Sequence, residues 1–230
     1  MKRRAALLLG ACGLWVQAAD FIAVTESMPP MQQEQDGVLS GENVDRVRAV
    51  LKQAGLSAEF RLYPWARAYN MAQRQSKVLI FALARTPARE AKFHWIGKLV
   101  EFRLGLVRLK QRGSPLNSLE QLKHKTIAVQ REDSAYQWLV QAGFAEGKQL
   151  MVAANSEQSW WLLANGKVDY VLENPLFLPE IERRNQLPPG SLVFDWAIPE
   201  LSASAYLAAS LGTPPELVQR LQQAYGQLKE

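Results

Sequence analysis

The sequence predicts an α/β protein of two lobes, each a mainly parallel sheet flanked by helices, with a cleft between the lobes. Short apolar runs typical of buried strands alternate with segments of helical period, which is the order of a parallel α/β sheet. This alternation begins near Phe21 and starts again at Leu104. Because ligands of such sheets usually lie beyond the carboxyl ends of the strands, we expect binding residues in the loops that follow them.

The predicted elements of the first half follow from hydrophobic spacing. Unbroken or alternating apolar residues predict strands at residues 21–24, 58–62 and 78–82. Apolar residues at helical spacing predict helices at residues 44–54 and 65–72, and Gly55 is suited to close the first of them. Strand, helix and strand therefore succeed one another without a break.

The second half repeats this order. Strands are predicted at residues 104–109, 126–129, 150–153, 168–172 and 206–210. Ser118 with Gln121 predicts a capped short helix, and Ser134 and Ser156 are expected to cap helices that run to residues 142 and 165. A terminal helix is expected from Pro214.

One arginine stands out between the predicted strand at 78–82 and Ile96. In Thr86-Pro87-Ala88-Arg89-Glu90, Thr86 can cap a helix, Pro87 suits its first position, and Arg89 falls at the third. A guanidinium beside a helix start, where free N–H groups already favour an anion, is suited to bind a carboxylate. The alternative is a solvated arginine on a short surface helix.

The first residues predict export. Lys2-Arg3-Arg4 and the apolar run to Val16 are typical of a signal peptide over residues 1–19, which places the mature protein in the periplasm. Processing at Cys12, as in a lipoprotein, is an alternative. Without the leader, 24 basic residues face 22 acidic ones, so the charge does not indicate a nucleic-acid partner.

Six motifs occur in the order and spacing of a known family. They are Pro29-Pro30, Gly41 before a helix, Tyr63-Pro64-Trp65-Ala66-Arg67, Thr86-Pro87-Ala88-Arg89-Glu90, Ser118-Leu119-Glu120-Gln121-Leu122 and Asn165-Gly166-Lys167-Val168-Asp169. In this order the chain resembles the family 3 bacterial extracellular solute-binding proteins, the periplasmic receptors for polar amino acids in ABC importers.

The resemblance implies a hinged, periplasmic-binding-protein-like fold of type II that traps a small solute, with residues 20–103 as lobe 1 and 104–198 as lobe 2. Residues 199–230 are expected to return, with the C-terminal helix packing on lobe 1 or the hinge. In the family, the arginine of the T-x-x-R motif holds the ligand's α-carboxylate, which implies this role for Arg89 beside Thr86.

Two positions depart from the family pattern. Ser134 matches a segment that donates backbone N–H groups, but Glu132 replaces its glycine. Asn174 stands where the family has the carboxylate for the α-ammonium, and an amide cannot neutralise an ammonium. Either the neighbouring Glu173 substitutes, or the ligand is not an ordinary α-amino acid. Near Pro29, many family members have an aromatic residue that stacks on the ligand. Met28 in this chain implies a more adaptable and less specific wall of the binding site.

The candidate ligand-binding residues share a place after a predicted strand or in a family motif. They are Arg89, Thr86, Trp65, Arg67, Met28, Ser134, Glu173 and Asn174. Each has a structural alternative. Trp65 can pack at a helix start, Arg67 can lie on the surface, and Glu173 and Asn174 can form a turn before Pro175.

The sequence favours a monomeric binding protein that passes its solute to a membrane permease or reports it to a membrane sensor. A periplasmic dehydratase of the same fold, acting on a cyclic hydroxy acid, is the enzymatic alternative, with Glu173 or Glu132 opposite Arg89 as the acid. We expect no cofactor and no metal, since phosphate-loop and dinucleotide patterns are missing and His94 and His124 lack paired spacing.

Overall fold

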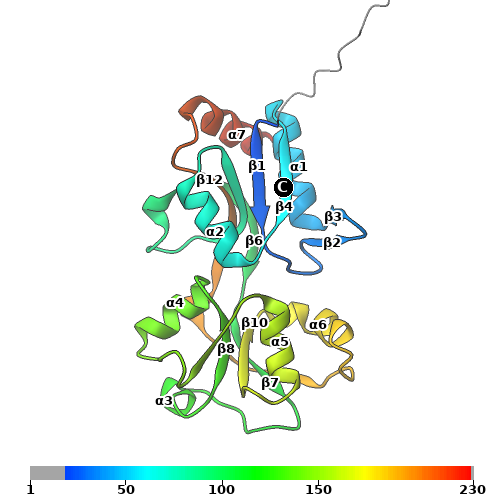
Figure 1. Ribbon diagram of the computed structural model, residues 1–230, viewed down its shortest axis with the longest axis vertical. Coiled ribbons are helices and arrows are strands. Elements are labelled where there is room, and N and C mark those ends of the chain that lie inside the picture. The colour runs from blue at the N-terminus through cyan, green and yellow to red at the C-terminus, as the bar shows by residue number, and fades with distance from the viewer. Residues whose placement is uncertain (1–18, 229–230) are drawn as a thin grey trace, which may run out of the picture.

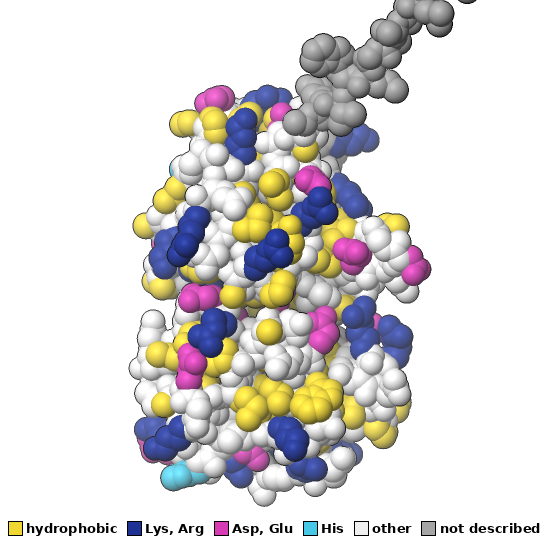
Figure 2. Space-filling model, viewed as in Figure 1, with side chains coloured by type: hydrophobic (Ala, Val, Ile, Leu, Met, Phe, Trp, Pro, Cys, Tyr) yellow, Lys and Arg dark blue, Asp and Glu magenta, His cyan; other side chains and the backbone are white. Residues whose placement is uncertain are grey.

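The computed structural model describes residues 19–228 and arranges them in two lobes, each built on a five-stranded sheet (Figure 1). The outline narrows where the lobes meet (Figure 2). The predicted leader and Cys12 lie outside the described residues. None of the helices in the described part is long and apolar enough to cross a membrane.

The first lobe is a mixed sheet in the order β4-β1-β5-β12-β6. Its strands are β1 (Phe21–Thr25), β4 (Ala58–Leu62), β5 (Val78–Ala84), β6 (Phe93–Phe102) and β12 (Ala203–Ser210). Strand β1 pairs in parallel with β4 and β5, whereas β12 is antiparallel to β5 and β6. Its helices are α1 (Glu42–Ala54), α2 (Trp65–Arg74) and α7 (Pro215–Gln227).

Both faces of this sheet are covered, which explains the unbroken apolar run of β5. Leu79 and Phe81 pack in a cluster with residues of α1 and α7. Val78 and Ile80 point the other way and pack in a cluster with residues of α2. Successive side chains of a strand alternate between faces, so a strand covered on both sides is apolar throughout. The fold predicted for this lobe is confirmed.

The second lobe repeats the arrangement in the order β11-β7-β10-β8-β9. Its strands are β7 (Gly105–Leu109), β8 (Ile127–Gln130), β9 (Leu150–Ala153), β10 (Tyr170–Glu173) and β11 (Leu192–Ala197). Strand β8 pairs in parallel with β9 and β10. Its helices are α3 (Leu119–Leu122), α4 (Ser134–Gln141), α5 (Ser156–Ala164) and α6 (Leu178–Arg184).

The chain crosses between the sheets twice. It leaves the first sheet between β6 and β7, and it returns between β11 and β12 through the short 3-10 helix η3 (Pro199–Leu201). The backbone N–H of Ile198 donates to the carbonyl of Leu104 at 3.0 Å, which ties the two crossings together. A hairpin of β2 (Gln33–Gln35) and β3 (Val38–Ser40) projects from the first lobe beside α1.

Three local predictions are wrong. No α-helix begins at Thr86. The chain forms a turn there, then the 3-10 helix η1 (Glu90–Lys92), because strand β6 begins at once at Phe93. Helix α4 is capped by the Asp133 carboxylate rather than by Ser134. Helix α5 is likewise capped one residue earlier than expected, by Asn155.

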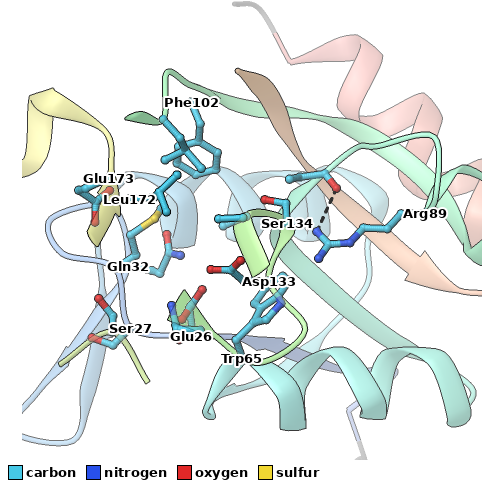
Figure 3. Close-up of a pocket in the computed structure, with 17 residues that line it drawn as sticks. Glu26, Ser27, Gln32, Trp65, Arg89, Phe102, Asp133, Ser134, Leu172 and Glu173 are labelled. Atoms are coloured by element: carbon cyan, nitrogen blue, oxygen red, sulfur yellow. Dashed lines mark hydrogen bonds between the residues drawn. The ribbon is translucent and has the colours of Figure 1, made fainter. Parts of the chain in front are cut away.

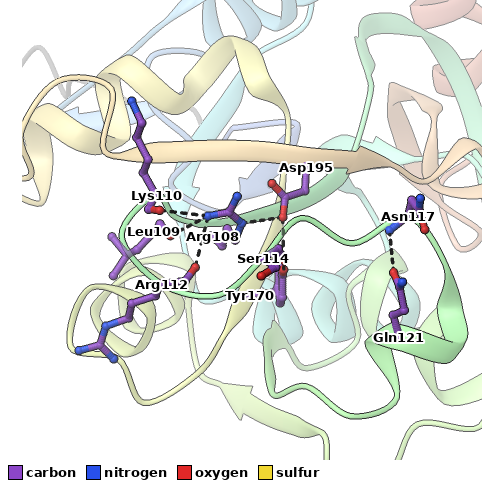
Figure 4. A network of polar contacts seen from close by, with 9 residues as sticks. All are labelled: Arg108, Leu109, Lys110, Arg112, Ser114, Asn117, Gln121, Tyr170 and Asp195. Carbon is purple, nitrogen blue, oxygen red and sulfur yellow. Dashed lines mark hydrogen bonds and ion pairs between the residues drawn. The ribbon is translucent and has the colours of Figure 1, made fainter.

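A buried ion pair holds the far end of the second lobe (Figure 4). The Nε of Arg108 lies 2.7 Å from a carboxylate oxygen of Asp195, joining β7 to β11. The same oxygen accepts from the Tyr170 hydroxyl at 3.2 Å. Arg108 also donates to three backbone carbonyls, those of Leu109, Lys110 and Arg112. The guanidinium is therefore well satisfied by protein groups and organises the loop after β7.

We expect Asp195→Ala to lower the free energy of unfolding by about 3–5 kcal/mol, because it leaves the Arg108 guanidinium buried without its carboxylate. Chemical denaturation measures this. Glu101→Ala is the control, since Glu101 pairs with Lys98 on the surface and its loss should leave stability unchanged. Equal effects of the two substitutions would contradict the structural role of the buried pair.

Candidate functional site

A cavity of about 110 Å³ lies between the two lobes and is lined by residues of both (Figure 3). Lobe 1 contributes residues from the loop after β1, from β5 and from the start of α2. Lobe 2 contributes residues from the loop between β8 and α4 and from the end of β10. The polar side chains that line it are Glu26, Ser27, Gln32, Arg89, Gln130, Asp133, Ser134, Ser156 and Glu173.

Arg89 enters this cavity from the turn after β5. Its backbone N–H donates to the carbonyl of Thr86 at 2.9 Å, which closes the turn. The side chain is only 1% exposed. Its guanidinium lies over the rings of Tyr69 and Trp65, at 4.9 and 5.6 Å from their centroids. Arg89 is thus a buried charge held against aromatic faces.

Two backbone carbonyls, one from each lobe, accept hydrogen bonds from Arg89. One guanidinium nitrogen donates to Ala84 at 3.3 Å, and the other donates to Glu132 at 2.8 Å. The Nε of Arg89 is buried and has no partner among the described residues. Burial lowers the pKa of Arg89, while Tyr69 and Asp133 act in the opposite direction.

Glu132 presents its backbone, not its carboxylate, to lobe 1. Its φ of 64° is in the left-handed region, where a residue with a side chain is uncommon. This geometry directs its carbonyl toward lobe 1, where the indole Nε1 of Trp65 donates to it at 3.0 Å beside the bond from Arg89. One carbonyl of lobe 2 therefore joins two side chains of lobe 1.

Carboxylates outnumber cations in the cavity. Glu26 directly follows β1 in lobe 1, whereas Asp133 and Glu173 come from lobe 2. Burial, together with the charge of the neighbouring Asp133, raises the pKa of Glu26 to about 8. Burial also raises the pKa of Glu173 to about 7. Figure 3 shows Arg89 and Glu173 on opposite sides of the view, with Glu26 and Asp133 between them.

Asp133 has a structural task as well. Its Oδ1 accepts from the backbone N–H of Tyr136 at 2.7 Å and so caps α4. Burial raises the pKa of Asp133, whereas this hydrogen bond and the charge of Arg89 lower it. Glu173 accepts only the N–H of its neighbour Asn174, at 2.7 Å, among the contacts of the described residues.

The rest of the cavity wall is neutral. Gln32 is fixed within lobe 1, since its amide donates to Thr25 at 3.4 Å and accepts from Asn43 at 2.8 Å. The side-chain oxygen of Gln130 is buried and lacks a donor among the described residues. Apolar contacts come from Met28, Trp65, Phe102, Leu104 and Leu172.

Part of the floor is an irregular stretch of β5. Ala82 adopts a φ of 58°, and the pairing of β12 with β5 shifts register between Tyr206 and Ala208 at the same place. A non-glycine residue in this conformation inside a strand costs energy that the surrounding structure must offset, and such residues cluster at functional sites.

The structure brings together five of the eight predicted site residues. Arg89, Trp65, Met28, Ser134 and Glu173 line the cavity, and their contact with a ligand stays a prediction.

The other three predicted residues lie elsewhere. Thr86 lines a neighbouring hollow, and the guanidinium of Arg67 lies 3.8 Å from the centroid of the Tyr63 ring. Asn174 is 2% exposed and accepts from the backbone N–H of Leu176 at 3.2 Å, so it caps the turn at Pro175. These positions agree with the structural alternatives given above, a surface position for Arg67 and a turn before Pro175 for Asn174.

Sequence reasoning missed Glu26, Gln130 and Asp133 as cavity residues. Each lies at or just past the carboxyl end of a strand, β1 for Glu26 and β8 for the other two. That position was the available signal. It marks too many residues to single these out, because the orientation of each side chain depends on how the lobes meet.

The chain resembles known proteins in sequence and in structure. Residues 21–162 match the family described as bacterial extracellular solute-binding proteins, family 3. A comparison with curated proteins found no match.

Among solved structures, a histidine kinase sensor domain with similarity to periplasmic binding proteins is 22% identical, with a TM-score of 0.77 over 90% of each chain. Holo ArgBP from T. maritima is 16% identical, with a TM-score of 0.75 over 91% of this chain and 90% of that one. An ancestral arginine-binding protein bound to glutamine is 21% identical, with a TM-score of 0.75 over 92% of each. These structures share the two-lobe fold. Since the family match covers more than half of the chain, the protein belongs to the family 3 bacterial extracellular solute-binding proteins.

Proposed function

We propose that the protein captures a small carboxylate-bearing solute, an amino acid or a close relative, between its lobes and presents the closed form to an ABC importer. The predicted leader places this activity in the periplasm. Of the two acids considered for the dehydratase alternative, Glu173 lines the cavity, whereas Glu132 is not among the lining residues and contacts Arg89 through its backbone carbonyl.

The observation that carries the proposal is a cavity with polar side chains from both lobes. Arg89 and Glu26 belong to lobe 1, whereas Asp133, Ser134 and Glu173 belong to lobe 2. A solute in this cavity contacts both lobes only when they are closed. Such a solute shifts the open–closed equilibrium by the free energy of the contacts that the closed state adds.

Arg89 is the anchor that we assign to the solute's carboxylate. Its Nε–H has no partner in the described part of the chain, and each terminal nitrogen carries a second N–H beyond the one that binds a backbone carbonyl. A carboxylate can therefore accept two hydrogen bonds along one edge of the guanidinium while the carbonyl contacts remain. Structures of similar fold were solved with arginine and with glutamine, both of which carry a carboxylate.

A ligand-sensing role is the second candidate. It is favoured by the fold shared with a histidine kinase sensor domain at a TM-score of 0.77. Transport and sensing use the same closed state, and they differ only in the membrane protein that recognises it.

We expect a ligand screen to raise the melting temperature of the mature protein. Amino acids and organic acids are the compounds to test, because each carries the carboxylate assigned to Arg89. A solute at one hundred times its dissociation constant stabilises the folded state by about 2.7 kcal/mol. The screen is read by differential scanning fluorimetry, and the absence of any shift would contradict solute capture.

We expect Arg89→Ala to weaken binding of the solute found in this screen by about tenfold to a hundredfold, since a hydrogen bond to a charged group contributes about 1.5–3 kcal/mol. Isothermal titration calorimetry measures the affinity. Arg67→Ala is the matched control, because Arg67 lies on the Tyr63 ring outside the cavity. Arg89→Lys keeps the charge without the fork and should bind with intermediate affinity. Unchanged affinity of a folded Arg89→Ala protein would contradict the anchor.

A further inference from the structure

We infer that the solute carries at least two positive charges, so that this cavity selects a basic amino acid or its relative over a neutral or acidic one. This inference rests on the proposed function and specifies the substrate class of the same site. Its basis is an imbalance of charge and of hydrogen-bonding groups inside the cavity.

The charges that line the cavity do not cancel. Among the lining residues, Arg89 is the single cation, whereas Glu26, Asp133 and Glu173 are acids. The guanidinium of Arg89 partly offsets Asp133, whose pKa it lowers. Glu26 and Glu173 have no ion pair within the described residues, and each faces further acids. Glu26 lies near Asp133, Glu157 and Glu173, and Glu173 lies near Asp133.

Hydrogen-bond acceptors are also in excess. Within residues 19–228, the side-chain oxygen of Gln130 is buried without a donor, and Glu173 accepts a single backbone N–H. A buried acceptor without a donor costs free energy, so a ligand rich in N–H groups is favoured here over one rich in oxygen. The unpartnered Nε of Arg89 is the exception, and it is the group assigned to the carboxylate.

Glu26 and Glu173 belong to different lobes, which links this excess of negative charge to closure. Two buried carboxylates without an ion pair among the described residues lose hydration in the charged form and take up protons more readily, consistent with the raised pKa of each. A solute with a single cationic nitrogen pairs with one of the two carboxylates and leaves the other without a cation. A solute with two cationic nitrogens pairs with the ionised carboxylates, and its contacts with both lobes favour the closed form.

The surrounding space suits an elongated cation. A second hollow of about 390 Å³ shares Met28, Ser156 and Glu173 with the cavity, so the two adjoin at these residues. Glu157 also lines it. Arg184 borders the same hollow, but its guanidinium is already bound to Glu180 at 3.0 Å and to Gln33 at 2.6 Å. A second cationic group can therefore reach carboxylates here.

Matched ligand pairs test the inference directly. Arginine and citrulline have nearly the same shape and differ in side-chain charge. Norleucine likewise has the side chain of lysine without the terminal ammonium. At pH 8 we expect calorimetry to show arginine or lysine binding at least tenfold more tightly than its neutral partner, and glutamate binding more weakly still.

The outcomes separate the two claims. If citrulline, norleucine or glutamate binds as tightly as the basic amino acids, the cationic class is wrong while solute capture stands. If none of these compounds binds, the proposed function and this inference both fail.

Substitution of the two unpaired acids provides the second test. We expect Glu26→Gln and Glu173→Gln each to weaken arginine binding, and one of the two to reduce the preference for arginine over citrulline at least tenfold, because the side-chain cation pairs with one carboxylate whereas the α-ammonium that both ligands carry pairs with the other. Glu59→Gln is the control, since Glu59 is exposed and pairs with Arg61 outside the cavity. A full preference retained in both cavity variants would overturn the assignment.

The affinity for arginine should also rise with pH. A cation binds the ionised carboxylates, so binding releases protons from Glu26 and Glu173, whose pKa values are about 8 and 7. Affinity is then lowest near pH 6 and rises through the pKa values of both carboxylates, and Glu26→Gln flattens the upper part of this profile. An affinity for arginine that is independent of pH across this range would contradict the pairing.

Discussion

The structure depends on a buried guanidinium between the lobes. Arg89 is 1% exposed, and a charge can be removed from water only where hydrogen bonds and favourable surroundings replace the lost hydration. Lobe 1 supplies the rings of Trp65 and Tyr69 and the carbonyl of Ala84, and lobe 2 supplies the carbonyl of Glu132. Complete satisfaction of this side chain therefore requires both lobes to be in contact.

The same contact between the lobes leaves two carboxylates without an ion pair among the described residues. Glu26 of lobe 1 and Glu173 of lobe 2 line the same cavity with raised pKa values, so Arg89 favours contact between the lobes whereas the ionised acids oppose it. Because Arg89 and the acids act in opposite directions, the proposed closure of the lobes depends on the charge of the solute. A ligand that supplies the missing positive charge removes the opposition of the acids, and the closed form becomes the favoured one.

Much of the fold could be predicted from the sequence because buried strands between two layers of helices have an unmistakable pattern. Strand β5 is the plainest case, since nearly every side chain in it is buried. Strand β6 was missed because exposed and buried residues mix in it without a period, and because it pairs with β12 from the far end of the chain. A helix was predicted at Thr86 because β6 was not foreseen. Strand β6 begins at Phe93 and leaves room only for a turn and the short η1.

The site was less predictable than the fold. Arg89, Trp65 and Glu173 were identified from strand ends and from family motifs, and the structure places them on one cavity. Glu26 was missed because a charged residue after a strand is ordinary until the opposite lobe covers it. The side chain of Asn174 turns back to cap its own loop, which the sequence allowed but did not select.

A crystal structure of the protein with arginine tests the central claim most directly. We expect the carboxylate of arginine on Arg89 and its cationic nitrogens within hydrogen-bonding distance of carboxylates from both lobes, Glu26 on one side and Glu173 or Asp133 on the other. Arginine bound outside the cavity, or inside it with its cationic groups directed to solvent, would contradict that claim.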